Sequence, residues 1–343
     1  MRIYVLRQLA LLIITLFLLT VFAFCLSYWF PGNPVTNSSG IFTDDTLRYT
    51  EAFEARGFDH NILVQYWFYL EHLFRGDWGI SLLDADPVFE QLKLRFGATL
   101  EIALLAMLLA IIPGIAFGVL AALNFRKPID HIILSISLSG YSIPVFWFAQ
   151  IAILVVAVHW GVLPIAGQIN PLFHIEPLTG SILLDIFITQ PENIELALRS
   201  AIRHIMLPVL VLSVMPMMLL IRLTRSSMLD VLDKNYITSA YAKGLSTRRV
   251  IASHAIPNTM QNVIRELGSM LSLLITNTMI IEVIFSWPGI GSWLIRSIYE
   301  RDYPVIQGGL LMIAALILCV HVGLNLIHSW RYPQVRKDLN AAS

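Results

Sequence analysis

Residues 236–258 read YITSAYAKGLSTRRVIASHAIPN, a polar stretch between long apolar runs on either side. Helix-forming residues end its first part, and Gly244 then supplies a residue that readily adopts a positive φ where a helix stops. Leu245 is the apolar residue that commonly follows such a cap. We expect a second helix, residues 248–255, to end near Pro257, because the residue before a proline avoids the α region. The stretch therefore predicts two short helices around a glycine, which project as a knob.

The composition around this knob is that of an integral membrane protein. The chain has 343 residues, of which 57% are hydrophobic and 13% charged, and its mean hydropathy is +0.71. This apolar composition makes membrane lipid an expected partner. The formal net charge is zero, so nothing in the charge balance points to nucleic acid. Cys25 and Cys319 lie in apolar runs, and the sequence contains no metal-ligand spacing, so we expect neither a metal nor a cofactor. It also contains no G-x-x-x-x-G-K-[ST] phosphate loop, so any ATP hydrolysis must occur on another chain.

Six apolar runs are candidates to cross the membrane, because about 20 residues of helix span the hydrocarbon core. They are residues 9–30, 102–123, 132–158, 205–221, 267–285 and 305–327. The first is longer than the apolar part of a signal peptide and ends in aromatic residues, so we interpret it as a retained helix. Pro144 predicts a kink in the third. The short run 178–188 contains Asp185 and is assigned to an external loop.

The distribution of charge predicts the orientation of these spans. With both chain ends inside, the cytoplasmic parts hold 14 of the 23 basic residues, whereas about 16 of the 23 acidic residues lie outside. The knob is then cytoplasmic and residues 31–98 are external, with a helical stretch near residues 61–73. The chain divides into a first helix at 1–30, the external segment at 31–98, a core at 99–330 and a cytoplasmic tail at 331–343.

Polar side chains inside the spans are candidates for a translocation path. Glu282 is either such a residue or an interfacial carboxylate bonded to a nearby donor. Hydroxyl residues recur on one face of the third span and on one face of the fifth, and they either line a path or allow close helix packing. Glu101 is interpreted as a first-turn acid of its helix, and no residues are paired as catalytic groups would be. The candidate path residues are Ser135, Ser139, Ser142, Ser272, Thr276 and Glu282.

The knob resembles the cytoplasmic loop motif of bacterial ABC importer permeases, E-A-A-x3-G-x9-I-x-L-P. The matching positions are Ala240, Gly244, Ile256 and Pro257, and the departures are Thr238, Ser239 and His254. In that family the loop is a coupling helix that docks on a separate ATP-hydrolysing subunit. The resemblance therefore implies that Ala240, Lys243, Gly244, Leu245 and Pro257 couple the chain to an ATPase. The alternative is an ordinary cytoplasmic loop with a helix cap.

Further stretches resemble the dipeptide/oligopeptide/nickel class of these permeases. They are FPGNP at 30–34, GDWGIS at 76–81, SIPVFW at 142–147, GVLPIAG at 161–167 and SWPGIG at 286–291. The loop at 171–185 is most similar to the Sap branch, which is linked to antimicrobial-peptide resistance and to polyamine movement. One departure is the tail, where residues 332–334 read YPQ and the family commonly has D-P-R.

The resemblance implies an all-α, six-helix type-1 ABC permease of the bacterial inner membrane. Its partners are then a similar second permease, two ATP-binding subunits and a periplasmic solute-binding protein, with residues 31–98 in the periplasm. Two other classes are weighed against this one. A self-contained secondary transporter is expected to show internal repeats, and no clear repeat of the two halves is visible. A membrane-embedded enzyme needs paired catalytic residues. The substrate and the direction of transport stay open.

Overall fold

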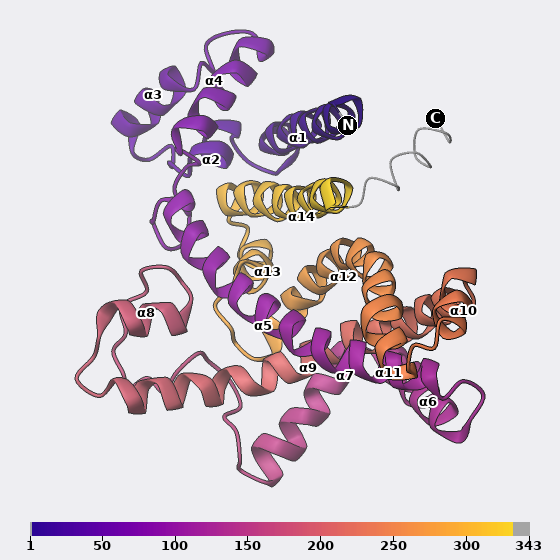
Figure 1. The fold of residues 1–343 in the computed structure, drawn as a ribbon. Coiled ribbons are helices and arrows are strands. Elements are labelled where there is room, and N and C mark those ends of the chain that lie inside the picture. The colour runs from indigo at the N-terminus through magenta and orange to yellow at the C-terminus, as the bar shows by residue number, and fades with distance from the viewer. Residues whose placement is uncertain (1, 332–343) are drawn as a thin grey trace. The chain divides into compact units, whose positions relative to one another are not determined.

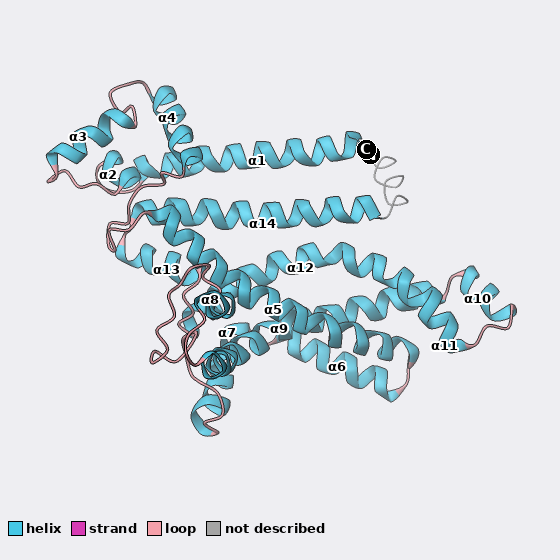
Figure 2. Ribbon diagram, turned by 60° about the vertical axis from the view of Figure 1, so that its left-hand side comes forward, coloured by secondary structure: helices cyan, strands magenta, loops and turns pink. Residues whose placement is uncertain are grey.

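The computed structural model of the protein describes residues 2–331, and the regular structure in them is helical, apart from one isolated antiparallel bridge between Ile80 and Pro87 (Figures 1 and 2). The helices in chain order are α1 Arg2–Trp29, α2 Pro34–Ser39, α3 Thr46–Ala55, α4 Ile62–Arg75, α5 Val88–Leu123, α6 Pro128–Ser142, α7 Val145–Ala152, the π-helical segment η1 Ile153–His159, α8 Ile182–Thr189, α9 Ile194–Leu232, α10 Asn235–Ala242, α11 Thr247–Val250, the π-helical segment η2 Ile251–Ala255, α12 Ile256–Ile284, α13 Ile290–Glu300 and α14 Tyr303–Arg331. The tail at 332–343, including its YPQ departure, lies outside the described residues.

Five of the described helical stretches are long and apolar enough to cross a membrane, and a sixth span is formed if one bent pair is counted as a single crossing. The five stretches are Val5–Trp29, Val88–Leu123, Ile194–Leu232, Thr247–Ile284 and Tyr303–Gly323. The bent pair joins α6 to α7 and η1 at an angle of 97°. The kink that we predicted at Pro144 is therefore a complete break. Ile143 and Pro144 both have extended backbone there, as expected of a proline and the residue before it.

Several helices extend beyond the apolar runs that predicted them. The 39 residues of α9 make a rod of about 58 Å, longer than a hydrocarbon core of about 30 Å, so this helix extends beyond both ends of the short span predicted at 205–221. The second span begins at Val88 instead of residue 102, which places Glu101 in mid-helix and excludes the predicted first-turn position. The connection between the fifth and sixth predicted spans contains the 11-residue helix α13. By contrast, α8 has eight residues and is too short to span, as predicted for the run at 178–188.

The chain packs as two compact units. Among the described residues, unit 1 comprises 2–100, Gln168–Leu198 and Ser286–Val322, and unit 2 comprises Glu101–Gly167, Arg199–Phe285 and 323–331. In unit 1, α1 and α14 lie side by side, as Figures 1 and 2 both show. Their contact includes a hydrogen bond from the Ser27 hydroxyl to Gln307 and a stack of the Phe30 and Tyr303 rings 4.6 Å apart.

The core of unit 1 explains why α5 starts early. Val88 and Leu92 are fully buried against Ile290, Trp293 and Val305. The opposite side of this first part of α5 carries charged residues, so the helix is amphipathic where it leaves the apolar run. The mean hydropathy of this part is low because its charged face is averaged with its apolar face. The apolar face alone is enough to pack the helix against the rest of unit 1.

In unit 2, two glycines allow α5 and α9 to approach closely. A Cβ atom added at Gly114 lies 2.6 Å from the Cβ of Leu220, and one added at Gly118 lies 2.6 Å from the Cβ of Thr224. Small residues four apart on one helix face are the usual means of bringing helix backbones together in a membrane. The spacing of Gly114 and Gly118 therefore fixes the contact between these two helices.

Candidate functional site

The knob is built around Gly244, which ends α10 in a left-handed conformation with φ of +80°. The Leu245 amide donates to the Ala240 carbonyl at 3.3 Å, and the Gly244 amide donates to the Tyr241 carbonyl at 2.9 Å. These bonds satisfy carbonyls that the end of α10 leaves open. A Cβ atom added at Gly244 meets nothing within 4 Å, so the glycine is required by its backbone angle and not by packing within the chain.

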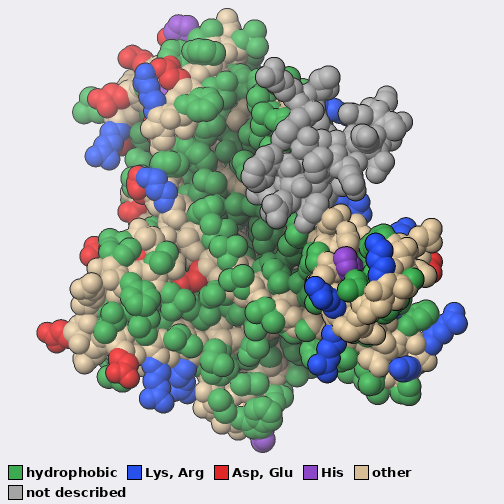
Figure 3. Space-filling model, in the orientation of Figure 1, with side chains coloured by type: hydrophobic (Ala, Val, Ile, Leu, Met, Phe, Trp, Pro, Cys, Tyr) green, Lys and Arg blue, Asp and Glu red, His purple; other side chains and the backbone are tan. Residues whose placement is uncertain are grey.

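The knob has a buried face and an exposed face. Ile237, Ala240, Val250 and Ala255 are buried in a cluster with Ala122, Met228 and Val231, and Leu245 packs against it half-buried. Ala240, which was predicted as a coupling residue, thus packs α10 against the rest of unit 2. The exposed face carries aromatic and basic side chains, and Figure 3 shows Lys and Arg gathered around α10 and α11. Its members are Tyr236, Tyr241, Lys243, Gly244, Arg248 and Arg249.

The second helix of the knob does not end near Pro257, so that prediction is wrong. The chain remains helical from α11 through η2 into α12, and together these elements form one stretch, Thr247–Ile284. The π-helical turn at Ile251–Ala255 lies directly before the proline. Pro257 is the second residue of α12, so the amide that it lacks falls in the first turn after the π-helical segment, a position where proline is tolerated. Pro257 is exposed on the side of this rod.

An ion pair joins the first turn of α6 to α9. Arg225 donates from Nε and Nη2 to the two carboxylate oxygens of Asp130, at 2.6 and 2.8 Å. The Arg126 amide also donates to Asp130 at 3.0 Å. Asp130 is 1% exposed, so its charge is buried with a two-point partner, the strongest arrangement for such a pair. Sequence reasoning counted Arg126 and Arg225 only as orientation signals and missed Asp130, an acid in the first turn of a helix beside a basic cluster.

The described polar candidates for a path do not form one recognisable site. Ser135, Ser139 and Ser142 are exposed along α6, where the Ser142 hydroxyl donates to the Leu138 carbonyl. On α12 the Ser272 and Thr276 hydroxyls donate to carbonyls one turn earlier, at 3.0 and 3.2 Å. Glu282 is fully buried near the end of α12. The two readings of these residues, path lining and close packing, both remain predictions.

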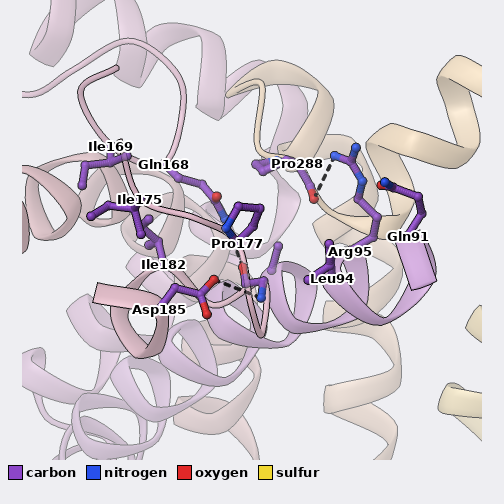
Figure 4. A pocket seen from close by; sticks show the side chains of 12 residues that line it. Gln91, Leu94, Arg95, Gln168, Ile169, Ile175, Pro177, Ile182, Asp185 and Pro288 are labelled. Carbon is purple, nitrogen blue, oxygen red and sulfur yellow. Dashed lines mark hydrogen bonds between the residues drawn. The ribbon is translucent and has the colours of Figure 1, made fainter. Parts of the chain in front are cut away.

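Unit 1 contains a pocket of about 360 Å³ beside α5 and the loop that precedes α8 (Figure 4). Asp185 holds this loop, since its carboxylate accepts from the Thr179 amide at 2.7 Å, the Thr179 hydroxyl at 2.6 Å and the Gly180 amide at 3.1 Å. The loop rests directly on α5. A Cβ atom added at Gly180 lies 1.8 Å from the Leu94 carbonyl oxygen, and one at Gly97 lies 1.9 Å from that of Thr179.

The pocket combines apolar walls with a few polar groups. Arg95 reaches from α5 toward Pro288, with its Nη1 3.4 Å from the Pro288 carbonyl oxygen, and Gln168 lies across from it (Figure 4). Gln168 donates to the Gly180 carbonyl. The Asp185 carboxylate accepts three hydrogen bonds from its own loop, and the other polar side chains of the lining are the Arg95 guanidinium and the amides of Gln91 and Gln168. Sequence reasoning used Asp185 only to exclude a span.

The family-like stretches of the sequence contact one another in unit 1. The Ser81 hydroxyl donates to Asp302 at 2.5 Å. The indole of Trp287 donates to the Ala98 carbonyl at 2.9 Å. These bonds join two segments of unit 1, the one at 31–98 and the one at 286–304.

A charged cluster stabilises the segment between α3 and α5. Asp77 accepts from Arg56 at 3.2 Å and contacts Nδ1 of His72 at 2.8 Å, while Nε2 of His72 lies 3.0 Å from the Ala55 carbonyl oxygen. The hydrogen bond to Asp77 raises the pKa of His72 above its usual value. The same bond, with the nearby Arg56 charge, lowers the pKa of Asp77 to about 2.

Comparison with known protein families covers nearly the whole chain. Residues 114–337 match the family described as binding-protein-dependent transport system inner membrane component, and residues 1–103 match the N-terminal model of the same systems. The chain belongs to this family. It is therefore the membrane-embedded permease subunit of an ABC transporter in the inner membrane, and ATP is hydrolysed by partner subunits. A solute-binding protein is the other partner that the family implies.

Curated relatives match over almost their full length. The dipeptide transport system permease protein DppB of Escherichia coli K12 is 37% identical over 336 residues, which is 97% of this chain and 98% of the relative. The di/tripeptide permease DppB of Pseudomonas aeruginosa is 38% identical over 333 residues, 97% and 98% of the two chains. The putrescine export system permease SapB of Escherichia coli K12 is 36% identical over 339 residues, 98% of each. The self-contained secondary transporter is not favoured.

Proposed function

We propose that this permease subunit moves peptides across the inner membrane and takes its driving motion from ATPase subunits that dock on the knob. The exposed face of the knob carries this proposal. It presents Tyr241, Lys243 and Gly244 on a short helix whose other face is anchored in unit 2. Because this helix is packed against unit 2, and because α11, η2 and α12 form one continuous helical stretch, a movement of the knob is transmitted to the membrane span in α12.

The knob is proposed to be cytoplasmic, with both chain ends on the same side. The charge distribution supports this orientation. Independent support comes from unit 1, where hydrogen bonds from Ser81 to Asp302 and from Trp287 to Ala98 join the segment at 31–98 to the segment at 286–304. Segments that share a folded unit through their connections belong on one side of the membrane.

We propose the family assembly for the complete transporter, with a similar second permease, two ATP-binding subunits and a periplasmic solute-binding protein. The resemblance places coupling residues on one knob per permease, which supports one ATPase subunit for each permease. The basic and aromatic exposed face, with Lys243, Arg248 and Arg249, suits a groove with acidic and apolar walls.

Peptides are the proposed substrate class. Two of the three relatives above are named for dipeptide or di/tripeptide transport, and the third is named for putrescine export. The pocket of unit 1 offers the Arg95 guanidinium, which suits the carboxylate of a peptide, a group that putrescine lacks. Uptake of labelled dipeptide by proteoliposomes, in competition with excess putrescine, decides between the two. Uptake of labelled dipeptide that excess unlabelled dipeptide reduces and excess putrescine does not supports this assignment. Uptake that only excess putrescine reduces contradicts it.

The coupling role is tested at Gly244. Gly244→Val places a β-branched residue at φ of +80° and should disrupt the cap, because such residues strongly disfavour the left-handed region. We expect the ATPase chains to co-purify at least tenfold less with the tagged variant, while its abundance in the membrane stays near that of the wild type. Wild-type levels of both co-purification and uptake would contradict the assignment.

A second variant separates the backbone from the surface. Gly244→Asn tolerates the left-handed conformation and meets open space within the chain, so it should preserve the cap. If Asn binds the ATPase and Val does not, the cap is what the partner requires. If both lose it, the partner's groove also excludes a side chain at this position. Arg249→Gln, an exposed change beside the cap, is the control and should reduce co-purification much less.

A further inference from the structure

Helix α4 carries an apolar stripe that unit 1 does not cover. Leu63, Trp67, Leu70 and Phe74 recur at spacings of four, three and four residues, which places them on one face of a helix. Leu63 is 79% exposed, Trp67 68% and Phe74 86%. A shallow groove of about 410 Å³ runs along this stripe between Trp67 and Phe74. Large apolar side chains so exposed and so regularly spaced mark an interaction surface.

The contact between α4 and α1 fixes the depth of this stripe. The Tyr66 hydroxyl lies 2.7 Å from that of Thr20, and the Tyr66 ring packs edge-on against Phe17 with centroids 6.1 Å apart. Thr20 precedes Trp29, the last residue of α1, by nine residues, or about 13.5 Å of helix. Because α1 crosses the membrane and ends in aromatic residues suited to the interface, Tyr66 reaches into the half of the bilayer nearest that end.

The other contacts of α4 show which way the stripe points. Gln65 is bonded by Tyr28, near the end of α1, and the Phe68 ring covers Gly57. His72 contacts the end of α3. All three side chains therefore lie toward the water-facing part of unit 1.

The stripe lies on the opposite side of α4. At about 100° per residue, Leu63, Leu70 and Phe74 follow about 40° to 80° beyond Tyr66, away from Gln65 and His72. The stripe thus continues in the direction that Tyr66 takes into the bilayer.

The exposed surface of α1 extends the same apolar face. Only 17% of its most apolar stretch is buried within the chain, and Ile13 and Phe17 are 65% and 52% exposed. The rim of the groove is polar, with Arg75 paired to Glu71 at 2.5 Å. An apolar stripe at this depth with an ion pair at its edge matches a helix that lies in a membrane interface.

We infer that α4 is embedded in the membrane leaflet at the C-terminal end of α1, with Leu63, Trp67 and Phe74 in lipid and the groove against a lipid acyl chain. A water-soluble partner cannot reach the depth that the Tyr66–Thr20 contact sets. The helix therefore anchors the segment between α1 and α5 to the membrane surface. This inference needs only that α1 crosses the membrane and is independent of the coupling role of the knob.

The experiment measures depth in the assembled transporter, reconstituted in vesicles of phosphatidylethanolamine and phosphatidylglycerol. Cys25 and Cys319 are first replaced by Ser, and a nitroxide is attached to single cysteines at positions 63, 67 and 74. Collisions with oxygen, which concentrates in lipid, are compared with collisions with a water-soluble nickel chelate. We expect oxygen to exceed nickel at all three positions by severalfold.

Two control positions match the test positions in exposure. Leu47 is an apolar residue of α3 that is 76% exposed, and Arg75 lies on the polar rim of α4. Nitroxides at 47 and 75 should collide more with nickel than with oxygen. If nickel also dominates at 67 and 74, the stripe faces water and the inference is wrong. If both reagents are excluded there, a protein chain covers the stripe, which equally overturns it.

Discussion

At the scale of single residues, the two ring nitrogens of His72 both face acceptors. Nδ1 contacts the Asp77 carboxylate and Nε2 the Ala55 carbonyl oxygen, so only the protonated ring can donate to both acceptors. The pKa of His72 is accordingly raised in the folded protein, chiefly by its bond to Asp77. The cluster can neither be found by a spacing rule nor by composition, because Arg56 and Ala55 meet His72 and Asp77 only after α3 and α4 have folded back on each other.

This protonation makes the segment sensitive to pH. A raised folded pKa contributes stability that is fully present below the unfolded pKa of about 6.5 and is lost as pH rises through the folded value. Asp77, with a pKa lowered to about 2, keeps its contribution until the medium is far more acidic. We expect the opening of residues 46–77, measured by hydrogen exchange corrected for intrinsic rates, to rise by at most about tenfold per pH unit between the unfolded pKa of His72 and its raised folded pKa, and to level off above the folded pKa.

The matched variant is His72→Gln, which has no titrating ring. Its opening should be faster than that of the wild type at pH 6 and should not change with pH beyond the intrinsic correction. A wild-type profile as flat as that of the variant would show that His72 is not protonated in the folded protein.

The Asp130–Arg225 pair gives a second prediction at this scale. Asp130→Asn leaves the Arg225 guanidinium without its two-point partner, and breaking a buried pair typically costs about 3 kcal/mol or more. We expect about 2 to 3 kcal/mol here, because the Arg225 side chain is 18% exposed. Thermal unfolding of the purified complex gives the loss. The double variant with Arg225→Gln should lose clearly less than the sum of the single variants, whereas strict additivity would contradict a direct interaction. Arg222→Gln, an exposed change one turn earlier, should have little effect.

At the scale of elements, apolar runs predicted where helices cross the membrane better than where they end. The run at 102–123 is entirely inside α5, yet α5 begins at Val88 because one apolar face, with Val88 and Leu92, packs on Trp293. The kink at Pro144 and the helix end near Pro257 follow from the same rule and had opposite outcomes. At Pro144 the helix is broken, because Ile143 and Pro144 are both extended. At Pro257 the helix continues through the π-helical turn that precedes it. No rule based on proline alone distinguishes these two sites.

The loop before α8 offers a prediction of its own. Gly180→Ala places a Cβ atom on the Leu94 carbonyl oxygen at a φ of +82°, so the loop must leave α5. Gly161→Ala is the matched control, since Gly161 has a φ of +63° but meets nothing within 4 Å. We expect Gly180→Ala to lose about 1 to 3 kcal/mol more than Gly161→Ala, as overpacking does. Thermal unfolding and the rate of proteolysis within 168–181 measure it, and equal losses would contradict the close contact.

At the scale of the whole molecule, the charge distribution predicted which connections share a side. The side of the membrane that each connection faces stays a prediction. Within unit 1, hydrogen bonds at Asp302 and Trp287 join the segments at 31–98 and 286–304, and within unit 2 Asp130 of α6 pairs with Arg225 of α9. The surface that binds a partner is harder to predict from the sequence. The knob was predicted from one glycine and its neighbours, whereas the division into a buried and an exposed face needed the packing of Ala240 and Val250.

The central claim, that an ATPase subunit docks on the exposed face of the knob, is tested most directly by cross-linking at Lys243. A photo-reactive amino acid replaces Lys243, which is exposed next to Gly244, and the assembled transporter is illuminated in its native membrane. The control places the same group at Leu47, an exposed residue of unit 1. The account predicts a covalent product with the ATP-hydrolysing chain from position 243 and none from position 47. It is contradicted if position 243 gives no such product, or if position 47 gives it equally.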